Sequence, residues 1–215
     1  MPRKHIVITV DGTAASGKGT LAKALARHFN GVYMDTGLLY RAVGVNSTSA
    51  EEAIQNAQSL ADNFNPSALD DPALRNEKAS QGASIAAAVP EVRAALLQLQ
   101  KDFANTLPKG KNCVVMDGRD IGTVVVPDAK FKFFVDAKIE ERAKRRAKEL
   151  QSLTNSDSYE AVLVAMRQRD ARDISRDIAP TKPANDALVI DTTDIGVEKM
   201  VELAIAHIKK IAPDL

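Results

Sequence analysis

The amino-acid sequence predicts an α/β protein built on a doubly wound, five-stranded parallel sheet. Two observations lead to this fold class. Short β-rich runs alternate with longer segments of helical periodicity, and each run ends at or next to an aspartate. A glycine-rich loop also follows the first run and leads directly into a stretch of good helix formers. The runs cover residues 6–11, 32–35, 113–117, 131–136 and 188–191.

Helices are expected between these runs and after the last one, over residues 18–29, 139–150, 159–173 and 196–211. The last of them carries one apolar stripe, formed by Val197, Met200, Val201, Ala204, Ile205, Ile208 and Ile211. Ligands of a doubly wound sheet bind beyond the carboxyl ends of its strands. We therefore expect the functional site among the aspartates and loops at those ends.

A segment between residues 46 and 105 interrupts the alternation. It contains no strand-like run, and it predicts helices over 49–60, 73–89 and 91–103. The first begins with a capping box at Ser49 and Glu52. The sequence thus predicts a core domain of residues 1–45 and 106–215, with a lid at about 151–185. A helical insertion of residues 46–105 would project over the active face.

Composition narrows the class of protein. The 215-residue chain is 45% apolar and carries a formal net charge of +1, so no overall field directs it to nucleic acid or to an anionic membrane. Cys113 is the single cysteine and excludes an internal disulfide. No apolar stretch is long enough to span a membrane, and the run after the basic start is too short for a signal peptide. We expect a soluble, cytoplasmic monomer.

Residues 12–20 read Gly-Thr-Ala-Ala-Ser-Gly-Lys-Gly-Thr and have the frame of a phosphate-binding loop. Gly12 and Gly17 allow positive φ, loop amides and the following helix N-terminus can bind phosphates, and Lys18 adds a mobile charge. A strand–helix turn that binds nothing is the alternative. The candidate ATP-binding residues are Gly12, Thr13, Ala14, Ala15, Ser16, Gly17, Lys18, Gly19 and Thr20.

The residue after Lys18 distinguishes between classes of phosphate-loop protein. Gly19 stands where many such proteins place the Ser or Thr that coordinates Mg²⁺. The chain also lacks an Asn-Lys-x-Asp element for reading guanine. Both features argue against a switch GTPase. The Gly-Lys-Gly-Thr string resembles nucleoside monophosphate kinases, in which Mg²⁺ is held mainly by nucleotide phosphates and water.

Three further polar segments lie near strand ends or on a helix. Residues 35–41 and 117–123 follow the second and third runs, and an arginine-rich helix face in 167–177 places charged residues three or four apart. A plain turn, a structural Arg–Asp pair and a solvated helix face are the respective alternatives. Arg142 and Arg146 likewise share a face, which either borders a nucleotide or belongs to a surface helix.

Taken together, these segments resemble bacterial cytidylate kinases, which transfer the γ-phosphate of ATP to CMP or dCMP. The resemblance covers nearly the whole chain. It rests on residues 12–20, 35–41, Ser84 with 90–93, the string Asp-Gly-Arg-Asp-Ile-Gly-Thr-Val-Val at 117–125, and the cluster at 169–176. Two departures are Thr36, where the family usually has serine, and residues 64–78, which predict a shorter and more helical segment than the family's β-hairpin.

The resemblance implies roles by matching position. Ser84, Arg93 and Asp120 would read cytosine, because a carboxylate can accept from the 4-amino group that uracil lacks. Arg169 and Asp173 would contact the ribose. The acceptor phosphate would be held by Thr36, Arg41 and Arg176.

The same resemblance implies direct in-line transfer between the two nucleotides. The residues that would stabilise the transferring group, together with Mg²⁺, are Lys18, Arg41, Arg172 and Arg176, and Asp117 would act on the metal through water. The alternatives are another small-molecule kinase with a phosphate loop and a nucleotide-dependent switch or binding protein.

Overall fold

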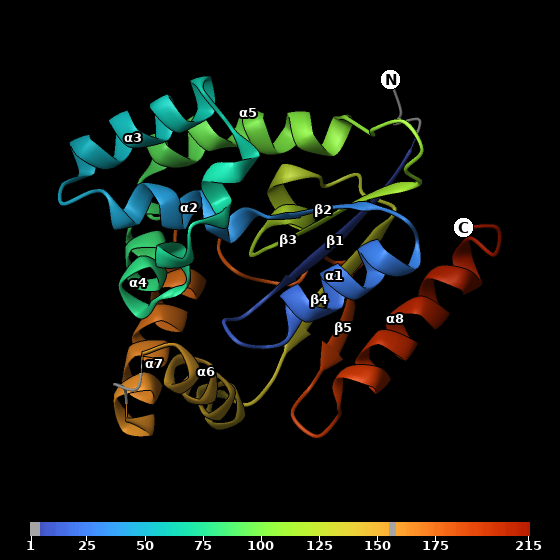
Figure 1. The fold of residues 1–215 in the computed structure, drawn as a ribbon. Helices are drawn as coiled ribbons and strands as arrows, with labels where there is room; N and C mark the ends of the chain where they lie inside the picture. Colours follow the sequence, from blue (N-terminus) through green and yellow to red (C-terminus); the bar gives the residue numbers. More distant parts are fainter. Residues whose placement is uncertain (1–4, 155–157) are drawn as a thin grey trace. The chain divides into compact units, whose positions relative to one another are not determined.

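The computed structural model of the protein describes residues 5–154 and 158–215, and its strands form one five-stranded sheet (Figure 1). The strands are β1 (Ile6–Gly12), β2 (Val32–Asp35), β3 (Cys113–Gly118), β4 (Phe131–Asp136) and β5 (Leu188–Asp191). Their order is β2-β3-β1-β4-β5 and every pair is parallel. This confirms the predicted doubly wound sheet, with two strands each one residue longer than predicted.

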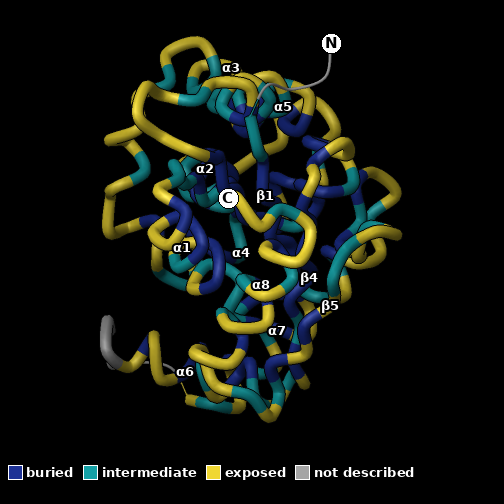
Figure 2. Tube along the Cα trace, turned by 90° about the vertical axis from the view of Figure 1, so that its right-hand side faces the viewer, coloured by how far each residue is buried: buried dark blue, intermediate teal, exposed yellow. Residues whose placement is uncertain are grey.

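The sheet core is closed on one face by α1 (Lys18–His28) and α8 (Val197–Ile211), which pack together (Figure 1). Ile8 and Val10 of β1 are fully buried, and β1 runs as a dark blue stretch in Figure 2. Cys113 belongs to this core, where burial raises the pKa of its thiol to about 11. The predicted stripe of α8 is buried only in part, because Val197 and Ile211 at its two ends are exposed.

The chain forms two compact units. The first comprises residues up to Asp35, Lys101–Arg142 and Thr181–Leu215, and it contains the sheet and the phosphate loop. The second comprises Thr36–Gln100 and Ala143–Pro180. None of the helices in the described part of the chain is long and apolar enough to cross a membrane.

The second unit is helical. Its elements are α2 (Thr36–Val45), α3 (Ala50–Asp62), the 3-10 turns η1 (Pro66–Asp70) and η2 (Pro72–Arg75), α4 (Glu77–Ala86), α7 (Tyr159–Ser175) and most of α5 (Pro90–Asn105) and α6 (Ile139–Thr154). Gly44 of α2 and Gly82 of α4 allow these two helices to touch. A Cβ atom built on Gly82 would lie 2.7 Å from the Gly44 carbonyl oxygen.

The prediction of one helix over residues 73–89 was wrong. Asn76 interrupts it, because its side chain accepts a hydrogen bond from the Ala79 amide at 2.8 Å and caps α4. Residues before Asn76 form the separate turn η2, which Asp71 caps through the Ala73 amide at 2.8 Å. Local side-chain caps thus overrode the helical periodicity. The Ser49 half of the predicted capping box of α3 is confirmed, with Ser49 Oγ accepting from the Glu52 amide at 3.2 Å, whereas the Glu52 carboxylate accepts from the Thr48 amide at 2.7 Å.

Candidate active site

The phosphate loop joins β1 to α1 in the conformation that its glycines predict. Gly12 has φ +152° and Gly17 has φ +97°, and Ala15 between them also has a positive φ, 57°. No side chain fits at Gly12, since a Cβ atom there would lie 2.0 Å from the Val135 carbonyl oxygen. Gly17 is the N-cap of α1. The loop therefore ends at a helix N-terminus whose first amides can bind an anion, directly beside Lys18.

Asp136 and Arg142 contact residues of this loop and fix its position. Thr13 Oγ1 donates to Asp136 Oδ1 at 2.6 Å, and Arg142 Nη1 donates to the Ala14 carbonyl at 3.3 Å. The Arg142 Nε also lies 3.7 Å from Asp136 Oδ1. Arg142 is buried, so the interpretation of this residue as part of a surface helix was wrong. Sequence reasoning did not assign a role to Asp136, although its place at the end of a strand was a signal.

Asp117 lies at the carboxyl end of β3, beside the loop strand and opposite Asp35 of β2. Burial and the nearby Asp35 carboxylate raise the pKa of Asp117 to about 7, against the opposing charge of Lys18 and a 3.0 Å hydrogen bond from the Tyr33 hydroxyl. Gly19 makes room for this carboxylate: a Cβ atom there would lie 3.2 Å from Asp117 Oδ2. A side chain at position 19 would therefore crowd the Asp117 carboxylate, and glycine leaves space for it.

Asp11, the residue before Gly12, fixes the segment that carries Asp120. Its two carboxylate oxygens accept from the amides of Ile121 at 2.8 Å and Gly122 at 2.7 Å. Burial raises the pKa of Asp11 to about 7, although both amide bonds favour the ionised form. These amides belong to a π-helical turn over Ile121–Val125, which the sequence analysis did not predict. Asp120 itself is buried directly before this turn.

The second unit brings Ser84 together with the two predicted ribose residues and with one predicted transfer residue, Arg172. Ser84 Oγ on α4 donates to Asp173 Oδ1 on α7 at 2.8 Å. Arg172 Nε donates to Ser84 Oγ at 3.3 Å, and Arg169 Nε lies 3.6 Å from Asp173 Oδ2. Arg169 and Asp173 are buried, so the interpretation of this arginine run as a solvated helix face was wrong for them. Buried charges require close polar partners, and Arg169 and Asp173 act as partners of each other.

The remaining predicted residues lie elsewhere in the second unit. Arg41 Nη1 donates to the Leu74 carbonyl at 2.8 Å, and Thr36 begins α2 with a buried side chain. The Arg93 guanidinium lies 5.6 Å from the centre of the Tyr40 ring. Arg176 Nη2 donates to the Ala179 carbonyl at 2.8 Å.

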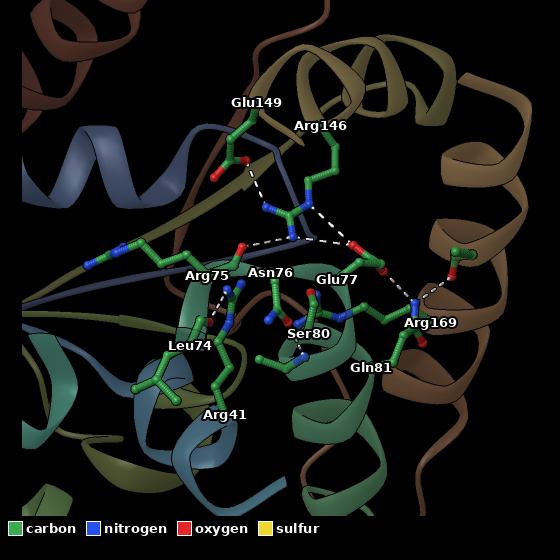
Figure 3. Close-up of polar contacts among 12 residues, drawn as sticks. Arg41, Leu74, Arg75, Asn76, Glu77, Ser80, Gln81, Arg146, Glu149 and Arg169 are labelled. Carbon is green, nitrogen blue, oxygen red and sulfur yellow. Dashed lines mark hydrogen bonds and ion pairs between the residues drawn. The ribbon is translucent and has the colours of Figure 1, made fainter. Parts of the chain in front are cut away.

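A polar cluster on α4 was missed by sequence reasoning (Figure 3). Glu77 accepts from Arg146, and Ser80 accepts from Arg169. Arg146 is buried, so the surface-helix interpretation was wrong for this residue also. The signal available in the sequence was the spacing of polar residues at 77, 80, 81 and 84, which places them along one face of a helix.

A lysine-bearing glycine loop between a parallel strand and a helix defines a protein of the phosphate-loop class, which binds nucleotide phosphates. The comparisons with known proteins then specify the family. The family model described as cytidylate kinase matches residues 8–210, and the chain belongs to this family. This confirms the resemblance that the motifs indicated.

Individual relatives agree over nearly the full length. The chain is 47% identical to a cytidylate kinase of Paramagnetospirillum magneticum, covering 94% of this chain and 97% of that protein. It is also 47% identical to a cytidylate kinase of Methylocella silvestris, covering 95% and 94%. A solved structure of an uncharacterized protein from Eubacterium ventriosum has a TM-score of 0.54 at 16% identity, covering 95% and 99%. This last likeness concerns the fold alone.

Proposed function

We propose that the protein transfers the γ-phosphoryl group of ATP to CMP or dCMP, forming CDP or dCDP and ADP. The observation that carries this proposal is the match of residues 8–210 to the cytidylate kinase family, in a chain that retains a complete phosphate loop with Lys18. The sequence relatives are named cytidylate kinases, and no described feature favours another kinase substrate or a switch protein.

On the donor side, the loop residues 12–20 and the N-terminus of α1 would bind the ATP phosphates. Mg²⁺ arriving on the nucleotide would neutralise charge on the β- and γ-phosphates. The residues present fit such an ion, because Asp117 places a buried carboxylate close to Lys18 and against Gly19. Asp117 would hold a metal-bound water rather than the metal, and its raised pKa would fall when that positive charge arrives.

On the acceptor side, Asp173 is suited to the ribose. It already accepts from Ser84 and lies beside Arg169, and a carboxylate can accept further hydrogen bonds from ribose hydroxyls. The cytosine would be read by Ser84, Arg93 and Asp120. The CMP phosphate would be held by Thr36, Arg41 and Arg176.

The chemistry needs no general base, because the attacking oxygen belongs to an already ionised phosphate. Catalysis then depends on alignment and on stabilising the charge of the transferring group. Lys18, Arg41, Arg172 and Arg176 would supply fixed positive charge for this purpose. We also infer that the protein is a cytoplasmic monomer. Its net charge of +1 gives no overall attraction to nucleic acid or to an anionic membrane, and we propose that it binds neither.

A coupled assay of ADP release over a panel of nucleoside monophosphates tests the function. We expect rapid turnover with CMP and dCMP, weak turnover with UMP, and none above background with AMP or GMP. ATP alone is the control for hydrolysis without an acceptor. Preference for a purine nucleotide, or ADP release that does not depend on CMP, would contradict the proposal.

A further inference from the structure

One face of α4 carries a polar residue on each successive turn. Glu77, Gln81 and Ser84 are spaced i, i+4 and i+7, which places all three side chains along the same side of the helix. Glu77 contacts α6, and Ser84 contacts α7. Gln81 lies between them and has no role in the proposed binding of either nucleotide.

The amide of Gln81 connects the residues on either side of it. Its Nε2 donates to Glu77 Oε1 at 2.7 Å and to the Ala165 carbonyl at 3.4 Å. Its Oε1 accepts from Arg172 Nη2. Because an ionised glutamate only accepts and an arginine only donates, these partners determine which end of the amide faces each of them.

Glu77 is itself held in place from the other side (Figure 3). Arg146 Nη2 donates to Glu77 Oε2 at 3.2 Å and to the Arg75 carbonyl at 3.4 Å, while Arg146 Nη1 donates to Glu149 at 2.9 Å. The Arg146 side chain is buried, so this ion pair is weakly screened by solvent. Glu77 is therefore a fixed acceptor, and it fixes Gln81.

The last member of this series is Arg172. Two contacts orient its guanidinium, one from Nε to Ser84 Oγ at 3.3 Å and one from Nη2 to Gln81 Oε1. The Ser84 contact leaves rotation about the long side chain, whereas the second contact defines the plane of the guanidinium. An arginine that must meet a transferring phosphoryl group gains from such orientation before the substrates arrive.

We propose that Gln81 is a positioning residue for phosphoryl transfer, which orients Arg172 through a chain of contacts from Arg146 and Glu77. The inference rests on the proposed function, in which Arg172 stabilises the transferring group. Gln81 would contact neither nucleotide.

The first test is Gln81→Leu, which removes both hydrogen-bonding ends at similar size. We expect kcat for CMP to fall about ten- to hundredfold, as for a misplaced catalytic group, while KM for ATP stays unchanged. The matched control is Gln58→Leu on the exposed face of α3, which should keep the wild-type kcat. A folded Gln81→Leu enzyme with normal kcat would overturn the proposal. If Gln81→Leu does not fold, Gln81→Ala takes its place.

A charge exchange separates positioning from general damage. Gln81→Glu keeps the acceptor for Arg172 but sets a carboxylate against Glu77, so kcat should fall. The double variant Glu77→Gln/Gln81→Glu restores a donor–acceptor pair between the two positions and should recover most of kcat. Failure of the double variant to exceed Gln81→Glu would count against the proposed chain of contacts.

The role of Arg172 is tested separately with Arg172→Ala. We expect this variant to lose kcat, and Gln81→Leu to cause no further loss when combined with it, because both changes remove one oriented guanidinium. Fully additive losses would overturn the role of Gln81. If Arg172→Ala keeps normal kcat, the assignment of Arg172 and the inference fail together, while CMP phosphorylation by the wild-type enzyme is unaffected.

Discussion

Asp117 should make the protein's stability depend on pH in an unusual direction. Burial and the Asp35 carboxylate raise the pKa of Asp117 from the ordinary value of 3.8 to about 7 in the folded protein. The folded state therefore binds this proton more tightly than the unfolded state. The stabilising contribution is fully present below about pH 4 and is lost as the pH rises to about 7.

Asp117→Asn removes this dependence, because the amide resembles the protonated acid and can still accept from the Tyr33 hydroxyl. A tenfold change in proton affinity corresponds to about 1.4 kcal/mol, so full ionisation of Asp117 costs up to about 4 kcal/mol. Relative to wild type, the variant should gain stability progressively between about pH 4 and pH 7 and hold that gain at higher pH.

Urea unfolding of the two proteins without nucleotide, at intervals from pH 4.5 to about pH 8.5, measures this difference. Asp62→Asn at the exposed end of α3 is the control and should show no such trend. A free-energy difference between wild type and Asp117→Asn that is constant with pH, or that shrinks as the pH rises, would refute the assignment of a raised pKa to this buried carboxyl.

Three other outcomes are expected. Lys18→Ala should lower kcat by about two to three orders of magnitude, measured as slower ADP release, and should leave the melting curve unchanged because the fold stays intact. A near-normal kcat would contradict a catalytic role for the loop. Asp120→Asn should lower the preference for CMP over UMP, measured as the ratio of their kcat/KM values, about ten- to hundredfold. An unchanged ratio would exclude Asp120 from base reading. Gly82→Ala should lower the free energy of unfolding in urea by about 1–3 kcal/mol, because the added Cβ meets the Gly44 backbone. The control is Gly196→Ala, whose Cβ has no neighbour within 4 Å and which should lower that free energy much less. Equal losses of stability in the two variants would contradict this packing.

Local patterns were sufficient to predict the sheet and the phosphate loop. Each strand is a short, mainly apolar run, so its position along the chain could be predicted without knowledge of its neighbours. The loop was predicted equally well, because the positive φ of Gly12 and Gly17 is a backbone conformation that glycine adopts without strain. Family membership followed from strings of this kind. The roles of the individual binding residues stay predictions.

Contacts between distant segments decided what the sequence alone could not. Arg146 looks like a surface residue along its own helix, and only the packing of α4 brings the partly exposed Glu77 to it and buries the arginine. Asp11 likewise continues an apolar strand, and its two amide donors come from residues 110 and 111 positions further along the chain. The amino-acid sequence by itself determined which segments become strands, helices and the phosphate loop, because those depend on local periodicity and backbone freedom. The tertiary structure decided which charges are buried and what each polar side chain holds, because burial and pairing depend on residues that meet only when the chain has folded.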